Sequence, residues 1–189
     1  MNLAKKLVSV AAGVALVAGV GLAAAPANAS TKVSGKTEVS LRKDLPKAFF
    51  DAIVAIKPAQ YAKLRVSFPV TGADGAVVTH SGGLGLKTIA GTQLDITNPV
   101  MTVDPAAKTA SIVFSTPTLG PQEIFGAKNF KIVSQKKDKK RKTTTTVWQG
   151  NATLTSNATV VAVLNQSLGV QLTPGQGIGR IKTTIVSRG

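Results

Sequence analysis

Alternating apolar and polar positions dominate the chain from residue 62 onward. In the clearest run, Leu64, Val66, Phe68 and Val70 alternate with polar residues, a period that predicts a strand with one buried face. Further strands are predicted at 37–41, 77–80, 84–86, 93–97, 101–103, 110–115, 125–134, 143–149 and 179–187. Short strands separated by Gly, Asn-Pro and Asp-Pro turn signals are typical of antiparallel sandwiches and barrels.

Two short segments have helical periodicity instead. Apolar residues recur at helical spacing over 45–56, with Asp44 as the expected N-cap and Pro58 as the end. The second predicted helix covers 158–168, with Thr155 or Ser156 as its cap and Gly169 just past its end. Because strands that are buried on both faces of a parallel sheet do not alternate, we predict a mainly β fold: an antiparallel β-sandwich with two short helices.

The first 29 residues predict a secretory signal peptide. MNLAKK is followed by an apolar run over 7–25 and by the small-residue site Ala27-Asn28-Ala29. A retained membrane anchor is the alternative, but the run is rich in Ala and Gly and ends at Pro26. We therefore expect cleavage after Ala29 and a secreted, extracellular protein of one domain, residues 30–189, without a further membrane-spanning segment.

The inventory of reactive side chains argues against an enzyme. The 189 residues include no Cys, one His, one Tyr and one Trp, which excludes a disulfide scaffold, a zinc–thiolate site, an iron–sulfur cluster and a Cys nucleophile. His80 and Ser81 are adjacent on a predicted strand and point to opposite faces, so they make a poor catalytic pair. We predict no catalytic residue and no metal site, and a hydrolase is the least favoured alternative.

The net charge is +15, and the densest cluster of cations lies at one place. The segment 136–142 is predicted to form a basic hairpin tip exposed to water, and its cations are Lys136, Lys137, Lys139, Lys140, Arg141 and Lys142. Such a tip attracts polyanions, for example an anionic cell-envelope polymer. Specific nucleic-acid binding is not expected, because Trp148 alone makes no stacking platform. The alternative is a solvated tip that keeps the protein soluble.

Tyr61 and His80 are the remaining candidates for ligand binding. A tyrosine phenolate ligates ferric iron in some haem proteins, and an imidazole that hydrogen-bonds the phenol would favour the phenolate. The alternative is a surface tyrosine and a histidine packed against Gly-rich backbone.

Several short motifs resemble the HtaA-type domain, a secreted or surface-attached domain of actinobacteria that is associated with haem uptake. They are Phe-Pro-Val-Thr-Gly at 68–72, Thr-His-Ser-Gly-Gly-Leu at 79–84 and Leu-Asp-Ile-Thr-Asn-Pro at 94–99. The likeness spans roughly 37–187 and implies a β-rich sandwich with small helices. It also implies that His80 supports a haem-ligating tyrosine. In the family that tyrosine lies further upstream, in the stretch that corresponds to residues 48–52. Here this stretch reads Ala-Phe-Phe-Asp-Ala and contains no tyrosine, so the candidate is Tyr61, the one tyrosine of the chain.

The sequence thus favours a secreted, non-catalytic HtaA-like protein that binds haem or a porphyrin through Tyr61 and His80 at the cell envelope. The alternative is a structural or polyanion-binding secreted protein that acts through the loop 136–142.

Overall fold

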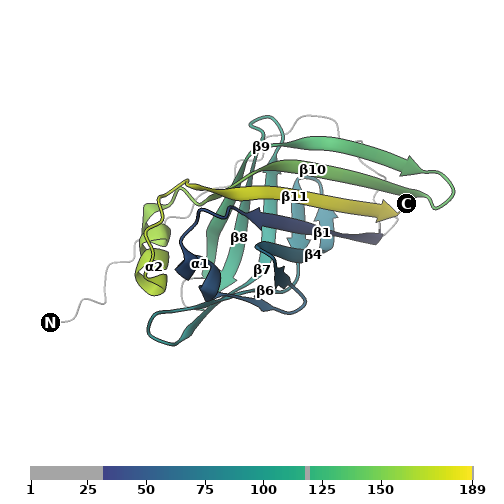
Figure 1. Ribbon diagram of the computed structural model, residues 1–189. Helices are drawn as coiled ribbons and strands as arrows, with labels where there is room; N and C mark the ends of the chain where they lie inside the picture. The colour runs from purple at the N-terminus through teal and green to yellow at the C-terminus, as the bar shows by residue number, and fades with distance from the viewer. Residues whose placement is uncertain (1–31, 118–119, 189) are drawn as a thin grey trace.

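The computed structural model describes residues 32–117 and 120–188, and the predicted signal peptide, 1–29, lies outside them. The described residues form eleven strands and two helices (Figure 1). In chain order these are β1 (Lys32–Leu41), α1 (Lys47–Ala52), β2 (Ile53–Ile56), β3 (Gln60–Ala62), β4 (Arg65–Asp74), β5 (Val77–His80), β6 (Gly83–Lys87), β7 (Gln93–Asp104), β8 (Thr109–Thr116), β9 (Gly120–Asp138), β10 (Thr143–Leu154), α2 (Ala158–Leu168) and β11 (Gly177–Arg188).

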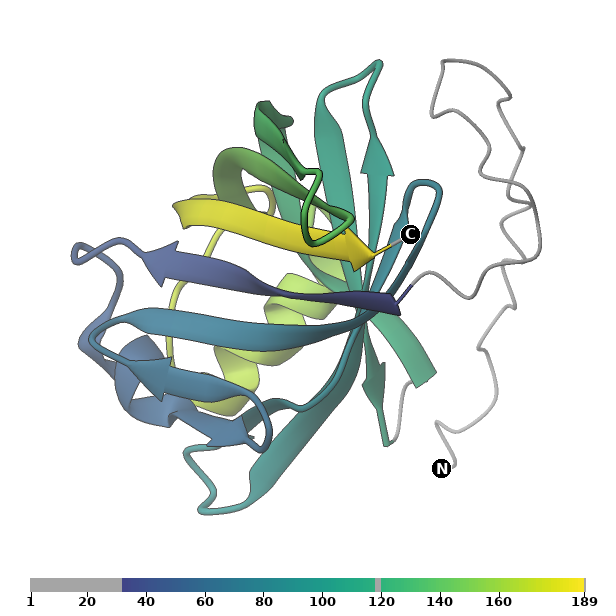
Figure 2. The same cartoon turned by 90° about the vertical axis from the view of Figure 1, so that its right-hand side faces the viewer.

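Eight of the strands close into a ring. Their order is β7-β5-β4-β1-β11-β10-β9-β8, and β8 pairs with β7 again. Every pairing is antiparallel, β3 joins β4, and β6 and β2 extend from β7 (Figure 2). The mainly β, antiparallel prediction with two helices is confirmed, but the predicted sandwich is wrong in one respect: the sheet is a closed barrel.

Closure depends on the single long strand β7, which the sequence pattern divides into 93–97 and 101–103. Its first half pairs with β6, and its second half pairs with β5 on one edge and β8 on the other. The register with β8 shifts between Thr97 and Val100, where Asn98 has a φ of 50°. An irregularity of this kind bends a strand without ending it. After the bend, β7 leaves its pairing with β6 and becomes a strand of the barrel, between β5 and β8.

The first helix is shorter than predicted. Residues 53–56 leave the helix and pair as β2 with β6. Their sequence, Ile-Val-Ala-Ile, is rich in β-branched residues, which favour a strand when a partner is present. Asp44 does not cap α1, because the N-cap position is Pro46, and the Asp44 carboxylate binds the Arg42 guanidinium instead.

The second helix begins and ends close to the predicted positions. Its N-cap is Asn157 rather than Thr155 or Ser156, and the Asn157 side chain accepts hydrogen bonds from the amides of Thr159 and Val160. Gly169 ends the helix in the left-handed conformation, with a φ of 64°, as the sequence predicts.

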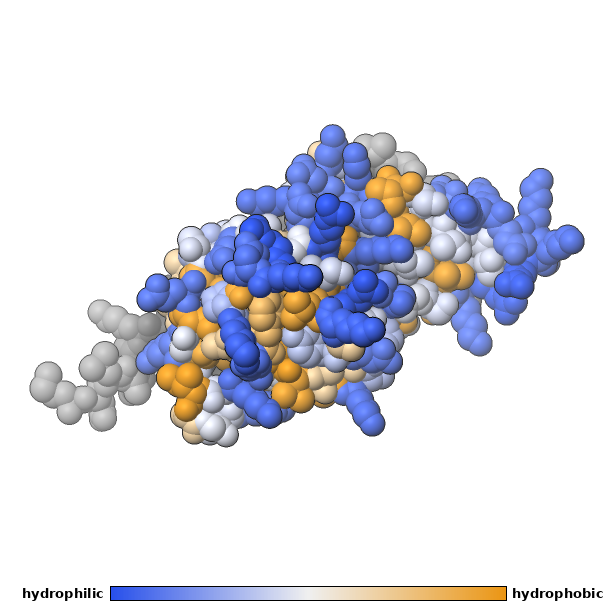
Figure 3. Space-filling model, viewed as in Figure 1, coloured by the Kyte–Doolittle hydropathy of each residue, from blue (hydrophilic) through white to orange (hydrophobic). Residues whose placement is uncertain are grey.

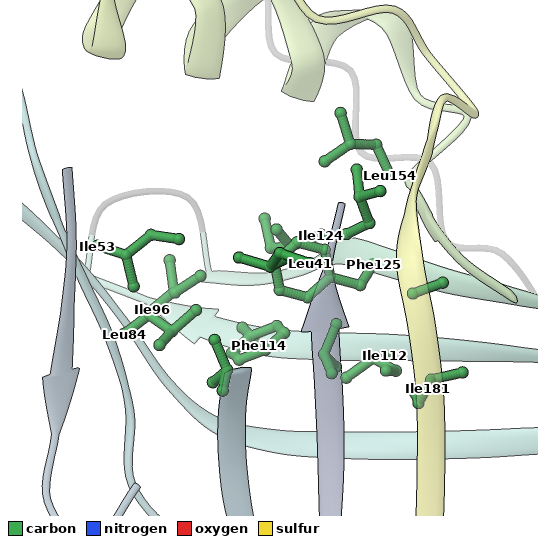
Figure 4. Packing of buried hydrophobic residues seen from close by; sticks show 14 of the residues in the cluster. Leu41, Ile53, Leu84, Ile96, Ile112, Phe114, Ile124, Phe125, Leu154 and Ile181 are labelled. Atoms are coloured by element: carbon green, nitrogen blue, oxygen red, sulfur yellow. The ribbon is translucent and has the colours of Figure 1, made fainter. Parts of the chain in front are cut away.

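Alternation along the strands separates a dry interior from a charged exterior. Val39, Val66, Phe68 and Ile181 are buried inside the barrel. The outward positions on the same strands carry polar side chains, and hydrophilic residues are widespread on the face seen in Figure 3. The interior continues to the end of the barrel beneath α2, where Leu41, Ile124, Phe125 and Leu154 pack together (Figure 4).

The two ends of the barrel differ. Helices α1 and α2 lie at one end, and α2 buries Val160, Val161, Leu164 and Leu168. At the other end the β9–β10 hairpin projects beyond the neighbouring strands, and the C-terminus lies beside it (Figure 1). The predicted basic tip is thus the loop of the longest hairpin.

Gly179 holds β11 close to β1, and its replacement by Ala should destabilise the barrel. An added Cβ would lie 1.9 Å from the Ser40 carbonyl oxygen, whereas at Gly177 on the same strand the nearest atom would be 3.9 Å away. We expect Gly179→Ala to lower the free energy of unfolding by about 2 kcal/mol and Gly177→Ala to change it little, measured by urea denaturation. Equal effects of the two substitutions would contradict the close approach of the two strands.

Candidate functional site

His80 lies inside the barrel, at the end of β5. It is 6% exposed, and both of its ring nitrogens are hydrogen-bonded. Nδ1 is 3.0 Å from the carbonyl oxygen of Pro99, and Nε2 is 2.7 Å from Oγ1 of Thr37. Because a carbonyl oxygen can only accept, Nδ1 carries the proton and Nε2 accepts from the Thr37 hydroxyl.

The hydrogen bonds continue from His80 across the barrel. The Oγ1 atoms of Thr37 and Thr183 are 2.9 Å apart, and the Thr183 hydroxyl lies 3.8 Å from Sδ of Met101. Thr37, Thr183 and Met101 are all at most 2% exposed. The four side chains, which we call the polar chain, come from β5, β1, β11 and β7 and therefore connect strands on different sides of the ring.

Burial sets the charge state of the imidazole. Desolvation lowers the pKa of His80 below its usual 6.5, and the hydrogen bond to the Pro99 carbonyl opposes this only in part. A neutral imidazole with one donor and one acceptor matches the two partners that the barrel provides. The geometry and the pKa therefore agree that His80 is uncharged at neutral pH.

Tyr61 lies on the short strand β3, near the helical end of β4. It is partly buried against the core, and its register partner on β4 is the buried Val66. Burial raises the pKa of the Tyr61 phenol, and the negative charge of Asp51 on α1 adds to this rise. The free side chain is therefore a neutral phenol at neutral pH.

The two predicted ligand-binding residues share one face of the sheet but do not bond to each other. Tyr61 is opposite Val66 and His80 is opposite Val70, so they are four positions apart along β4, or about 13 Å. Phe68, which is 2% exposed, lies between these two positions. Both nitrogens of His80 are occupied by Thr37 and Pro99.

The basic tip has the geometry of a tight hairpin. Residues 139–142 connect β9 to β10, and Asp138 is paired with Thr143. The Asp138 carboxylate accepts hydrogen bonds from the amides of Lys140 and Arg141 and lies 3.8 Å from the Arg141 guanidinium. The predicted cations 136, 137, 139, 140, 141 and 142 are all exposed, and the one acidic residue of the tip organises its turn.

Sequence reasoning missed Thr37, Thr183 and Met101, the members of the polar chain that continues from His80. Thr37 and Thr183 are at inward positions of strands that otherwise bury Val39 and Ile181. A threonine at an apolar position of an alternating strand is the signal that could have found them. The partner strands could not be paired from the sequence, because residues 37 and 183 are 146 positions apart.

The described part of the chain offers no other arrangement with evident chemistry. Within it, no group of three or more His, Cys, Asp and Glu side chains is placed to hold a metal ion. No carboxylate hydrogen-bonds the His80 ring there, so the arrangement of a catalytic triad is not built around it. None of the helices in residues 32–117 and 120–188 is long and apolar enough to cross a membrane.

Solved structures with this fold include two from Corynebacterium glutamicum. The haem-binding protein HtaB matches with a TM-score of 0.53 and 16% identity, over 84% of this chain and 95% of that chain. The C-terminal domain of HtaA matches with a TM-score of 0.55 and 10% identity, over 83% of this chain and 98% of that domain. No protein-family model and no curated protein sequence gives a significant match. The chain thus has the fold of the HtaA-type domain, which confirms the resemblance at the level of the fold.

The buried imidazole should make the stability of the barrel depend on pH. Because the pKa of His80 is lower in the folded protein than its usual 6.5, the unfolded chain binds a proton first as the pH falls. The contribution is complete above pH 6.5 and declines below it, by at most about 1.4 kcal/mol per pH unit. We expect the free energy of unfolding to fall more steeply below pH 6.5 in the parent protein than in His80→Gln. Parallel profiles for the two proteins would contradict a buried neutral imidazole.

Proposed function

We propose that this chain is a secreted, non-catalytic protein that binds haem or a related porphyrin at the cell envelope. The observation that carries the proposal is the fold. More than four-fifths of the chain matches two structures that each align over nearly their full length, and one of these is described as a haem-binding protein. A likeness in fold alone does not transfer a ligand, so the residues must be tested for their fit to haem.

Tyr61 is the side chain best placed to hold haem iron. The imidazole of His80 is buried and both its nitrogens are engaged, and the sulfur of Met101 is fully buried. The Tyr61 phenol is only partly buried, and a tyrosine can serve as the axial ligand of haem. Bound haem would supply a ferric centre that favours the phenolate, which would offset the effects of burial and of Asp51 on the pKa of Tyr61.

We assign His80 a supporting role that does not require contact with Tyr61. A direct hydrogen bond between them would require His80 to give up Thr37 or Pro99. By holding β5 against β1 and β7, His80 fixes the strand that pairs with the far half of β4. The position of Tyr61 against the near half of β4 would then depend on His80 through the sheet.

The proposal predicts that haemin binds and that Tyr61 ligates its iron. Addition of haemin to residues 30–189 should produce a shifted Soret band. Tyr61→Phe removes only the hydroxyl and should abolish that shift. It should also weaken binding at least about tenfold, the loss typical even of a residue that merely supports a metal ligand. Metal-free protoporphyrin should bind both proteins equally.

The two probes separate the function from the residue. Failure of both haemin and protoporphyrin to bind the folded protein would contradict porphyrin binding itself. Haemin binding with an unchanged Soret band in Tyr61→Phe would leave the function standing and contradict the role of Tyr61.

Removal of the negative charge beside Tyr61 should strengthen haemin binding. Asp51 raises the pKa of the phenol, so Asp51→Asn should ease the loss of the phenolic proton. A gain of about twofold in affinity at neutral pH is expected from a partly screened charge. Asp74→Asn, at the exposed end of β4, is the matched control and should leave the affinity unchanged. The same gain in both variants would show that only net charge matters.

A further inference from the structure

The outer surface of five consecutive barrel strands carries cationic and polar side chains in ordered rows. The strands are β4, β1, β11, β10 and β9, and their outward side chains face the viewer in Figure 3. We call this surface the cationic face and define it by Lys36, Glu38, Ser40, Arg65, Ser67, Lys131, Gln149, Asn151, Arg180 and Lys182.

Strand register arranges these residues into two neighbouring rows across the sheet. One row runs Ser67–Glu38–Lys182–Gln149–Lys131, and the next runs Arg65–Ser40–Arg180–Asn151. Within each row the cations are two strands apart, or about 10 Å. In the second row the neutral side chains of Ser40 and Asn151 alternate with the cations. In the first row Gln149 lies between Lys182 and Lys131, and Glu38 is the neighbour of Lys182 on β1.

Shallow hollows follow the same rows. A hollow of about 380 Å³ is lined by Lys131, Gln149, Arg180 and Lys182. A second, of about 570 Å³, shares Ser40, Asn151 and Arg180 with it. A third, of about 330 Å³, shares Glu38 with the first and continues to Lys36 and Arg65. Neighbouring hollows therefore share lining residues across the face, from β9 to β3.

The protein neutralises only part of the positive charge of this face. Glu38 is its only acidic residue, and it lies 3.1 Å from Lys36 and 3.6 Å from Arg65. Among residues 32–117 and 120–188, no carboxylate is within ion-pair distance of Lys131, Arg180 or Lys182. Lys182 is opposite Glu38 in the register but forms no ion pair with it. Cations without an ion-pair partner raise the local concentration of anions.

We infer that the cationic face binds an extended anionic polysaccharide. The cations would contact its charged groups, and Ser40, Gln149 and Asn151 would hydrogen-bond the sugar hydroxyls between them. A single-stranded nucleic acid fits less well, since it needs exposed rings for its bases. Trp148 is opposite the buried Thr183 on the inner side of the sheet, where it stacks on Phe130 at 5.6 Å and 14°.

This site differs from the basic tip and from the proposed porphyrin site. The tip cations lie on the last residues of β9 and on the exposed turn 139–142 at the end of the β9–β10 hairpin, outside the rows defined above. Tyr61 and His80 are on the inner face of β3 and β5. Polysaccharide binding can therefore be tested independently of haemin binding.

The experiment measures binding of fluorescent alginate, a carboxylate polysaccharide, to the purified chain by anisotropy at low and high salt. Lys182→Glu reverses the charge at the centre of one row, and Lys87→Glu makes the same change at an exposed position on β6. We expect an affinity loss of about tenfold for Lys182→Glu, a loss of less than about twofold for Lys87→Glu, and weaker binding of all proteins at high salt. If Lys182→Glu fails to fold, Arg180→Gln tests the neighbouring row.

Competitors and a tip variant decide between the inference and its alternatives. The inference expects alginate to bind more tightly than polyglutamate, which carries carboxylates without sugar hydroxyls, and more tightly than single-stranded DNA or phosphatidylglycerol vesicles. Tighter binding of any of these three overturns it. Equal losses of alginate affinity in Lys182→Glu and Lys87→Glu would show that binding depends on net charge alone, and would overturn the inference. A loss of alginate affinity seen only in the double substitution Lys139→Gln and Lys140→Gln would show that the basic tip is the binding site, and would overturn the inference.

Discussion

Closure of the sheet on itself is the constraint on which the rest of this structure depends. The chain contains no Cys, so no disulfide ties the strands together. Backbone pairing around the ring and the apolar interior must do so. The join is made at β7, which bends after Thr97 and reaches both β5 and β8. Without that bend, β8 and β5 would each present an open edge and the interior would lie between two separate sheets.

The polar chain shows how the closed barrel accommodates a buried imidazole. An unpaired histidine in this interior would be costly, but Thr37 and the Pro99 carbonyl satisfy both of its nitrogens. Pro99 follows the bend of β7, and its carbonyl, which accepts the hydrogen bond from Nδ1 of His80, belongs to the same irregular segment. His80 is therefore hydrogen-bonded to the segment of β7 at which the barrel closes. This structural role accounts for its burial without a ligand.

The sequence predicted strand positions far better than strand partners. Period-two alternation located β4, β5 and β8 because each has one buried face. It divided β7 in two, because Asn98 and Pro99 look like a turn when β6, β5 and β8 are unknown. It also extended the first helix through 53–56, because Ile53 and Ile56 fit helical spacing as well as a strand. Tyr61 and His80 could be singled out by their rarity, but the distance between them depends on how β3 and β5 align with β4.

The unequal lengths of the strands leave one long edge that the barrel does not cover. β9 pairs with β8 as far as Lys128, and in the described part of the chain no strand joins that edge over residues 131–138. An uncovered edge is a template on which a second molecule can add its own strand. Lys131, Lys136 and Lys137 place like charges along it, so two molecules that approach edge to edge repel one another. The overhanging hairpin can therefore be long without seeding the growth of a fibril.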